Sequence, residues 1–112
     1  TGFLMQTQDG YMSAQLMAQE RHEYTLDGLH NGTLEEMAKA AYGYHAYSGQ
    51  YEVDEKKQIL YHHMEVSMIP NRLGKMQDRI IFIDGNKITI TSNATSSYIV
   101  WERAEDHSQN SL

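Results

Sequence analysis

The stretch that decides the fold is Tyr61-His62-His63-Met64-Glu65-Val66-Ser67-Met68-Ile69-Pro70-Asn71. Its residue types predict one β-strand over residues 58–68 that ends at the proline. Successive side chains of a strand point to opposite faces of the sheet, so one face is mostly apolar and the other carries an imidazole and a carboxylate. The first face carries Leu60, His62, Met64, Val66 and Met68, and the second carries Tyr61, His63, Glu65, Ser67 and Ile69.

The composition is that of one globular domain. The 112 residues are 40% hydrophobic and 21% charged, and the 7 methionines and 8 tyrosines suit a pocket for an organic ligand. The net charge of −6 without a Lys/Arg cluster argues against nucleic acid and membrane surfaces as partners. The absence of cysteine excludes disulfides and thiolate metal sites. With no apolar run of about 20 residues and no visible signal peptide, we expect a cytoplasmic protein, although the chain begins at Thr1 rather than at methionine.

Turn signals divide the chain into short strands and one helix. Asp9-Gly10 and Asp84-Gly85 are typical of tight hairpins, and Thr33-Leu34-Glu35-Glu36 matches a capping box, which predicts a short helix that ends at Gly43. Short connections favour up-and-down antiparallel order, and sheets of this size commonly close into a small barrel around one ligand. We expect one domain over residues 1–103 and a polar tail over residues 104–112. The predicted strands are residues 2–7, 11–18, 45–53, 58–68, 77–83, 88–90 and 97–103.

Three blocks of the sequence form a pattern in a fixed order. They are Asp9-Gly10-Tyr11-Met12-Ser13-Ala14-Gln15-Leu16, then Tyr47-Ser48-Gly49-Gln50-Tyr51-Glu52-Val53, then His62-His63-Met64-Glu65 through Ser67 to Pro70-Asn71. The pattern resembles the small lipocalin-like domain proteins of bacteria and fungi over roughly residues 5–103, and Gly74, Gln77, Arg79, Asp84-Gly85 and Trp101 fall where that family has them. The resemblance implies an all-β, eight-stranded antiparallel barrel with a central pocket. Members often occur beside natural-product biosynthesis genes, which implies a polyketide-like or other small organic ligand.

The sequence departs from that family at its beginning. Members normally start with a strand of the Gly-Thr-Trp type, so seven strands are visible here of an expected eight. A seven-stranded remainder leaves two unpaired edges, which proteins usually avoid. We expect the gap either to be narrowed by closure with fewer strands or to be covered by a second copy of the chain, in a homodimer or a higher homo-oligomer.

The candidate catalytic residues are His62, His63, Glu65 and Arg79. His63 and Glu65 share a face about 7 Å apart along the strand, where the carboxylate would raise the basicity of the imidazole. Without a bulge only one of the two histidines points inward, and the pattern leaves open which one. Arg79 would pair with Glu65 or with a ligand carboxylate or enolate, or else its head group reaches water at the rim.

The candidate ligand-binding residues are Tyr11, Tyr47, Tyr51, Met64, Gln77 and Trp101. The tyrosines offer phenol donors, but aromatic residues of this kind serve equally well as core. A metal site would need His63, Glu65 and a third ligand such as His45, in a spacing that matches no known zinc motif. We therefore predict neither a metal nor a cofactor.

Three functions follow from these residues. In the first, the barrel encloses a small, largely apolar organic molecule and catalyses its cofactor-free cyclisation or isomerisation, a chemistry that the resemblance implies through distant cyclase relatives. In the second, the same pocket only binds or carries the molecule. In the third, methionine and tyrosine side chains fill the interior of a structural, oligomer-forming module.

Overall fold

The computed structural model describes residues 1–92 and 97–104. Two compact units share the chain: Thr1–Tyr51 with His62–Gln77, and Glu52–Tyr61 with the described residues from Asp78 onward. Of the predicted tail, residues 105–112 lie outside the described part.

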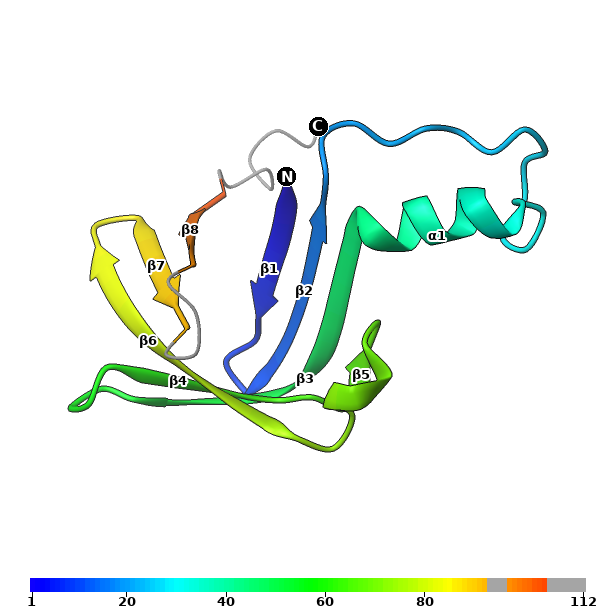
Figure 1. Cartoon of the computed structure of the whole chain (residues 1–112). Helices are drawn as coiled ribbons and strands as arrows, with labels where there is room; N and C mark the ends of the chain where they lie inside the picture. The colour runs from blue at the N-terminus through cyan, green and yellow to red at the C-terminus, as the bar shows by residue number, and fades with distance from the viewer. Residues whose placement is uncertain (93–96, 105–112) are drawn as a thin grey trace, which may run out of the picture. The chain divides into compact units, whose positions relative to one another are not determined.

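The described part of the chain consists mainly of strands. They are β1 (Gly2–Gln6), β2 (Tyr11–Met17), β3 (Tyr44–Asp54), β4 (Ile59–His63), β5 (Val66–Ser67), β6 (Met76–Asp84), β7 (Lys87–Thr91) and β8 (Tyr98–Glu102). Hydrogen-bonded neighbours follow the order β1-β2-β3-β4-β6-β7-β8, and the two-residue β5 pairs with β3 (Figure 1). The pairs β1–β2, β2–β3, β3–β5, β6–β7 and β7–β8 are antiparallel. The predicted all-β class with seven strands in up-and-down order is confirmed for the described residues.

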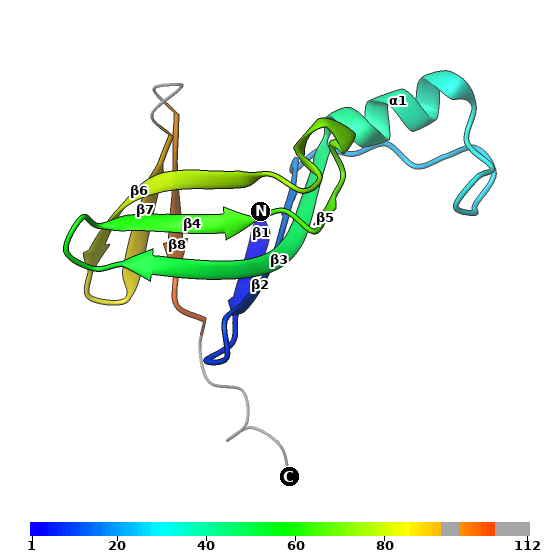
Figure 2. The same ribbon diagram turned by 90° about the horizontal axis from the view of Figure 1, so that it is seen from below.

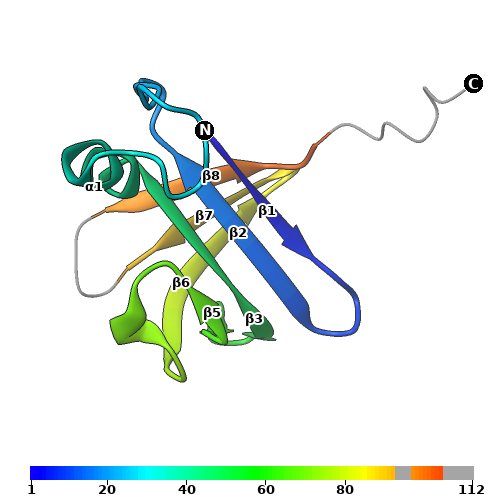
Figure 3. The ribbon, with the colours of Figure 1, turned by 90° about the vertical axis from the view of Figure 1, so that its right-hand side faces the viewer.

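In the first unit, β1, β2 and β3 lie side by side in one antiparallel sheet (Figure 3). Residues paired across two antiparallel strands share a face of the sheet. Ala14 has no exposed surface and Met12 has 3%, so their face of β2 is the buried one. The β2–β3 register brings six residues to this face by pairing Met12 with Gly49, Ala14 with Tyr47, and Leu16 with His45.

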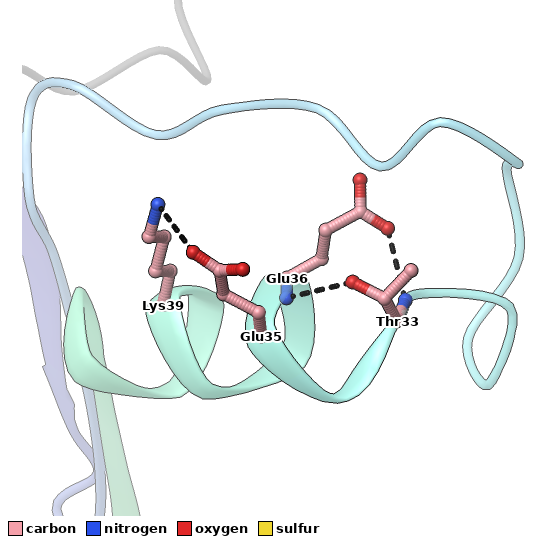
Figure 4. Close-up of polar contacts among 4 residues, drawn as sticks. All are labelled: Thr33, Glu35, Glu36 and Lys39. Atoms are coloured by element: carbon pink, nitrogen blue, oxygen red, sulfur yellow. Dashed lines mark hydrogen bonds and ion pairs between the residues drawn. The ribbon is translucent and has the colours of Figure 1, made fainter.

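The predicted helix forms as α1 (Leu34–Tyr42). The Thr33 hydroxyl accepts a hydrogen bond of 3.1 Å from the Glu36 backbone N–H, and the Glu36 carboxylate accepts one of 2.9 Å from the Thr33 N–H (Figure 4). These bonds satisfy two N–H groups at the start of the helix, as a capping box requires. The Thr25 backbone N–H and hydroxyl also donate to Glu36, and hydrogen bonds from the Thr33 and Thr25 backbone hold the pKa of this carboxyl below its ordinary value.

The helix does not cover the sheet of its own unit. It extends away from the start of β3, and the segment from β2 loops back over it (Figures 1 and 2). None of its residues is buried, and Leu34 and Tyr42 are largely exposed. The capping box and the Lys39–Glu35 ion pair of 3.3 Å therefore stabilise a helix that contributes little to the core.

The predicted single strand over residues 58–68 is wrong, because the chain breaks between β4 and β5. The Met64 N–H donates to the Lys75 carbonyl at 2.9 Å, and the next N–H, from Glu65, donates to the Ser48 carbonyl of β3 at 2.9 Å. Two consecutive residues thus bond to different segments, which ends the regular alternation. The predicted apolar face is buried as far as Met64 but not beyond it, since Val66 is exposed.

Gly49 of β3 makes room for this break. A Cβ atom at that position would come within 1.8 Å of the His63 carbonyl oxygen and within 3.1 Å of the Glu65 nitrogen. Both of these are backbone atoms, so a flexible side chain cannot move aside to accommodate a methyl group. The close approach of the two backbones therefore requires glycine.

In the second unit, β6, β7 and β8 form an antiparallel sheet with an isoleucine-rich face. Ile81 is buried, and the Ile81 N–H donates to the Gln58 carbonyl at 2.9 Å. Trp101 of β8 is half-buried and belongs to the same face. The register aligns Ile81, Ile90 and Ile99 in one row and Ile83, Ile88 and Trp101 in the next.

We predict that Gly49→Ala destabilises the protein by about 1–3 kcal/mol, the usual cost of forcing a methyl group into occupied space. Gly43→Ala is the matched control, because a Cβ atom there would meet nothing closer than Ala18 at 3.5 Å. Urea unfolding of the two variants measures the difference. Equal midpoints for Gly49→Ala and the wild type would contradict the close approach.

Candidate functional site

A row of rings lies on the buried face of the first unit. His45 and Tyr47 come from β3, and their ring centroids are 5.2 Å apart at an interplanar angle of 47°. His62 comes from β4, and its ring centroid lies 5.5 Å from that of Tyr47, again at 47°. Tyr47 thus stands between two imidazoles, with spacings typical of favourable aromatic contacts.

Strand alternation and register place these rings. His45 and Tyr47 are two residues apart on β3, so both point to the face that they share with Leu16 and Ala14 of β2. His62 has 2% of its surface exposed, between the equally buried Leu60 and Met64 on the same side of its chain segment. The row therefore runs from a half-buried imidazole to a fully buried one.

Arg72 joins the row at its half-buried end. It belongs to η1 (Pro70–Arg72), a single turn that follows β5, and its Nη1 lies 3.4 Å from His45 Nε2. A guanidinium only donates hydrogen bonds, so His45 Nε2 has to be the acceptor and the imidazole proton has to sit on Nδ1. Burial, and then the positive charge of Arg72, lower the pKa of His45, which favours this neutral form.

The predicted catalytic residues lie in different surroundings. His62 faces the buried side, His63 is half-buried on the other side of β4, and Glu65 is exposed beyond the strand break. Arg79 lies on β6, mainly within the second unit, where its Nη1 donates to the Asp78 carbonyl at 2.9 Å. The break separates His63 from Glu65, and the catalytic roles of all four residues stay predictions.

The predicted ligand-binding tyrosines divide between the two faces of the sheet. Tyr47 lies in the row, and Tyr51 is on the same side of β3 with its hydroxyl donating to the Thr7 carbonyl at 2.7 Å. Tyr11 lies on the opposite face and is 50% exposed. Met64 is buried in the first unit, whereas Gln77 and Trp101 are half-buried on β6 and β8.

Sequence reasoning missed Arg72 and gave His45 a role only in a metal site. Pro70-Asn71-Arg72 predicts a turn and nothing more, because the partner of Arg72 lies 27 residues earlier in the chain. Among the residues that the structure describes, no three histidine, aspartate or glutamate side chains are grouped so that they could hold a metal ion. No helix within these ranges has the length and apolar character needed to cross a membrane.

A separate hollow of about 800 Å³ lies between the segment 20–23 and α1. Its walls carry mainly charged and polar side chains, among them Arg21, Glu35 and Lys39. Its lining contains none of the predicted site residues.

Comparison with known proteins identifies relatives of the chain. The family model of the lipocalin-like domain matches residues 1–109. The 4'-hydroxy-3'-methoxypropiophenone carrier protein ppsC of Aspergillus oryzae (strain ATCC 42149 / RIB 40) is 28% identical over 106 residues, which covers 82% of this chain and 96% of that protein. No solved structure matches the chain. These findings confirm the resemblance and the lipocalin-like fold class predicted from the sequence.

We predict that His45 titrates below about 6.5, the ordinary pKa of histidine, in a pH series of NMR spectra. Unfolded chains bind this proton near pH 6.5, so the contribution of His45 to stability is present above that pH and is lost as the pH falls through the folded pKa. Arg72→Gln should raise the pKa part of the way, because burial remains the larger cause. Lys75→Gln removes an exposed charge three residues away and should change the pKa less. A wild-type His45 that titrates at or above 6.5 would refute this.

Proposed function

The chain belongs to the lipocalin-like domain family, and on that premise we propose that it binds and carries a small, largely apolar organic molecule. We assign the binding surface to the buried face of the first unit, along the row of His45, Tyr47 and His62. The observation that carries this assignment is the contact of the Tyr47 ring with two imidazoles, each tilted by 47° to it, on an otherwise apolar face.

The carrier role is supported by the name of the Aspergillus oryzae relative. The match covers 96% of that protein, so the two proteins correspond over one whole domain. The relative is named as a carrier of an aryl ketone, which combines an aromatic ring with a few polar oxygens. A ligand of this class suits a face that offers aromatic contacts and very few polar groups.

The local chemistry of the face supports the same class of ligand. Binding sites for small organic molecules are mostly apolar, with a small number of polar groups that fix the orientation of the ligand. Here the buried Met12, Ala14 and Met64 make the surroundings of the rings apolar, and the imidazoles and the tyrosine supply the polar atoms. Methionine also adapts its shape to ligands of irregular outline.

The first test is binding of 4'-hydroxy-3'-methoxypropiophenone in equilibrium dialysis. We expect saturable 1:1 binding and a Kd that rises about tenfold, equivalent to about 1.4 kcal/mol, in Tyr47→Leu, because the ring contact is lost. Tyr11→Leu is the matched control, since it makes the same change on the opposite face and should bind like the wild type. Equal loss in both variants would refute the assignment of the face.

The second test separates a carrier from an enzyme. A carrier should return the ligand chemically unchanged after long incubation, at any ratio of ligand to protein, as chromatography would show. More than one equivalent of a cyclised or isomerised product per protein would contradict the carrier role and favour the catalytic alternative. His62→Gln, His63→Gln and Glu65→Gln would then identify which of the predicted acid–base residues is required.

A further inference from the structure

Arg72 has no acidic partner in the part of the chain that the structure describes. The residue is half-buried, its only side-chain hydrogen bond there is the one to His45, and no described carboxylate lies within ion-pair distance of 4.0 Å. The chain has 15 acidic residues against 9 arginines and lysines, so a shortage of acidic side chains does not explain why Arg72 lacks an acidic partner there. A partly buried guanidinium generally needs a counter-ion, and here the described side chains do not supply one.

The neighbour of Arg72 is a second base rather than an acid. His45 accepts one guanidinium N–H through Nε2, and a guanidinium has five such donors in a planar fork. The fork therefore retains donors for a further acceptor. Two adjacent bases, one of them always charged, attract an anion and repel a cation, and an arginine fork can donate two parallel hydrogen bonds to one ionised group such as a carboxylate.

The position of Arg72 sets how a ligand would lie. Arg72 occupies the half-buried end of the row, and the 2% exposed His62 occupies the other end, beyond Tyr47. A flat aromatic molecule along Tyr47 would present one end to the cation and the other to buried, largely apolar surroundings. Such a face would distinguish ligands by whether the end of the molecule that lies at Arg72 carries a negative charge.

We propose that the molecule carried by this protein is an acid, bound through an ionised oxygen against Arg72 and His45 with its aromatic body along Tyr47. This inference rests on the proposed carrier function and narrows its ligand to aromatic molecules that bear a phenolate or a carboxylate. Binding removes no atom other than the acidic proton, which leaves to the solvent.

Three probes with one aryl-ketone body test the proposal: 4'-hydroxypropiophenone, 4'-methoxypropiophenone and 4-propionylbenzoic acid. The hydroxyl compound can ionise, the methyl ether cannot, and the benzoic acid is ionised at pH 7. We expect the wild type to bind at least one of the two acids tenfold or more tightly than the ether. The acid that binds more tightly shows whether the site prefers a phenolate or a carboxylate. If the phenol is preferred, its bound form should show the longer-wavelength absorption of a phenolate at a pH where the free compound is protonated.

The variants locate the effect. Arg72→Gln should reduce the affinity for the preferred acid about tenfold or more and leave the affinity for the ether unchanged. Lys75→Gln, which removes one positive charge at an exposed position nearby, should keep the preference for the acid. If Arg72→Gln does not fold, Arg72→Lys retains the charge without the fork and should show an intermediate preference.

The outcomes separate this inference from the proposed function. Equal binding of the acids and the ether by the wild type would refute the acid-specific site and keep the carrier function. A preference that survives in Arg72→Gln would also refute it, because the cation would then lie elsewhere. Failure of all three compounds to bind would refute both the carrier function and the acid-specific site for ligands with an aryl-ketone body.

Discussion

The close approach of Gly49 to the backbone at His63 is the constraint on which the first unit depends. It holds β3 against the end of β4 at the point where the chain leaves one hydrogen-bonding partner for another. The register of β2 and β3 then fixes which side chains share the buried face, and with them the order His45, Tyr47, His62. A side chain at residue 49 would push these segments apart and would disturb the ring contacts before it affected any distant part of the chain.

The same break that Gly49 permits also positions the charge at the end of the row. After Glu65 bonds to Ser48, the chain forms β5 on β3 and turns through η1, which returns Arg72 to the side of His45. Had the strand continued to residue 68, as its sequence pattern predicts, Arg72 would follow in a different direction. Packing and charge in this site therefore share one structural cause, the switch of partners at Met64 and Glu65.

Local patterns predicted the parts of the fold that depend on neighbouring residues. The capping box placed α1 within its bounds because Thr33 and Glu36 satisfy each other over three residues. Alternation correctly put Leu60, His62 and Met64 on one face, but it could not foresee the break, which depends on carbonyl groups of Ser48 and Lys75 supplied by other segments. The contact of Arg72 with His45 could not be predicted from the sequence for the same reason, since nothing in Pro70-Asn71-Arg72 indicates a partner 27 positions earlier. The comparison with the family matched the whole pattern over residues 1–109, which explains why the fold class was easier to predict than the site.

The proposed ligand is an acid although the protein itself is acidic, but the net charge of the protein and the positive charge of Arg72 act over different distances. The net charge of −6 is spread over the surface, and at physiological ionic strength its repulsion is screened beyond about 8 Å. A partly buried guanidinium is screened much less, so Arg72 dominates the field felt by a ligand once it lies on the face. In the proposed site, the net negative charge would weaken non-specific attraction of anions, while Arg72 would favour a molecule whose apolar body places its ionised oxygen at the end of the row. The proposed selectivity needs this combination, because neither the apolar face nor the charge of Arg72 alone would distinguish an aromatic acid from other apolar molecules and other anions.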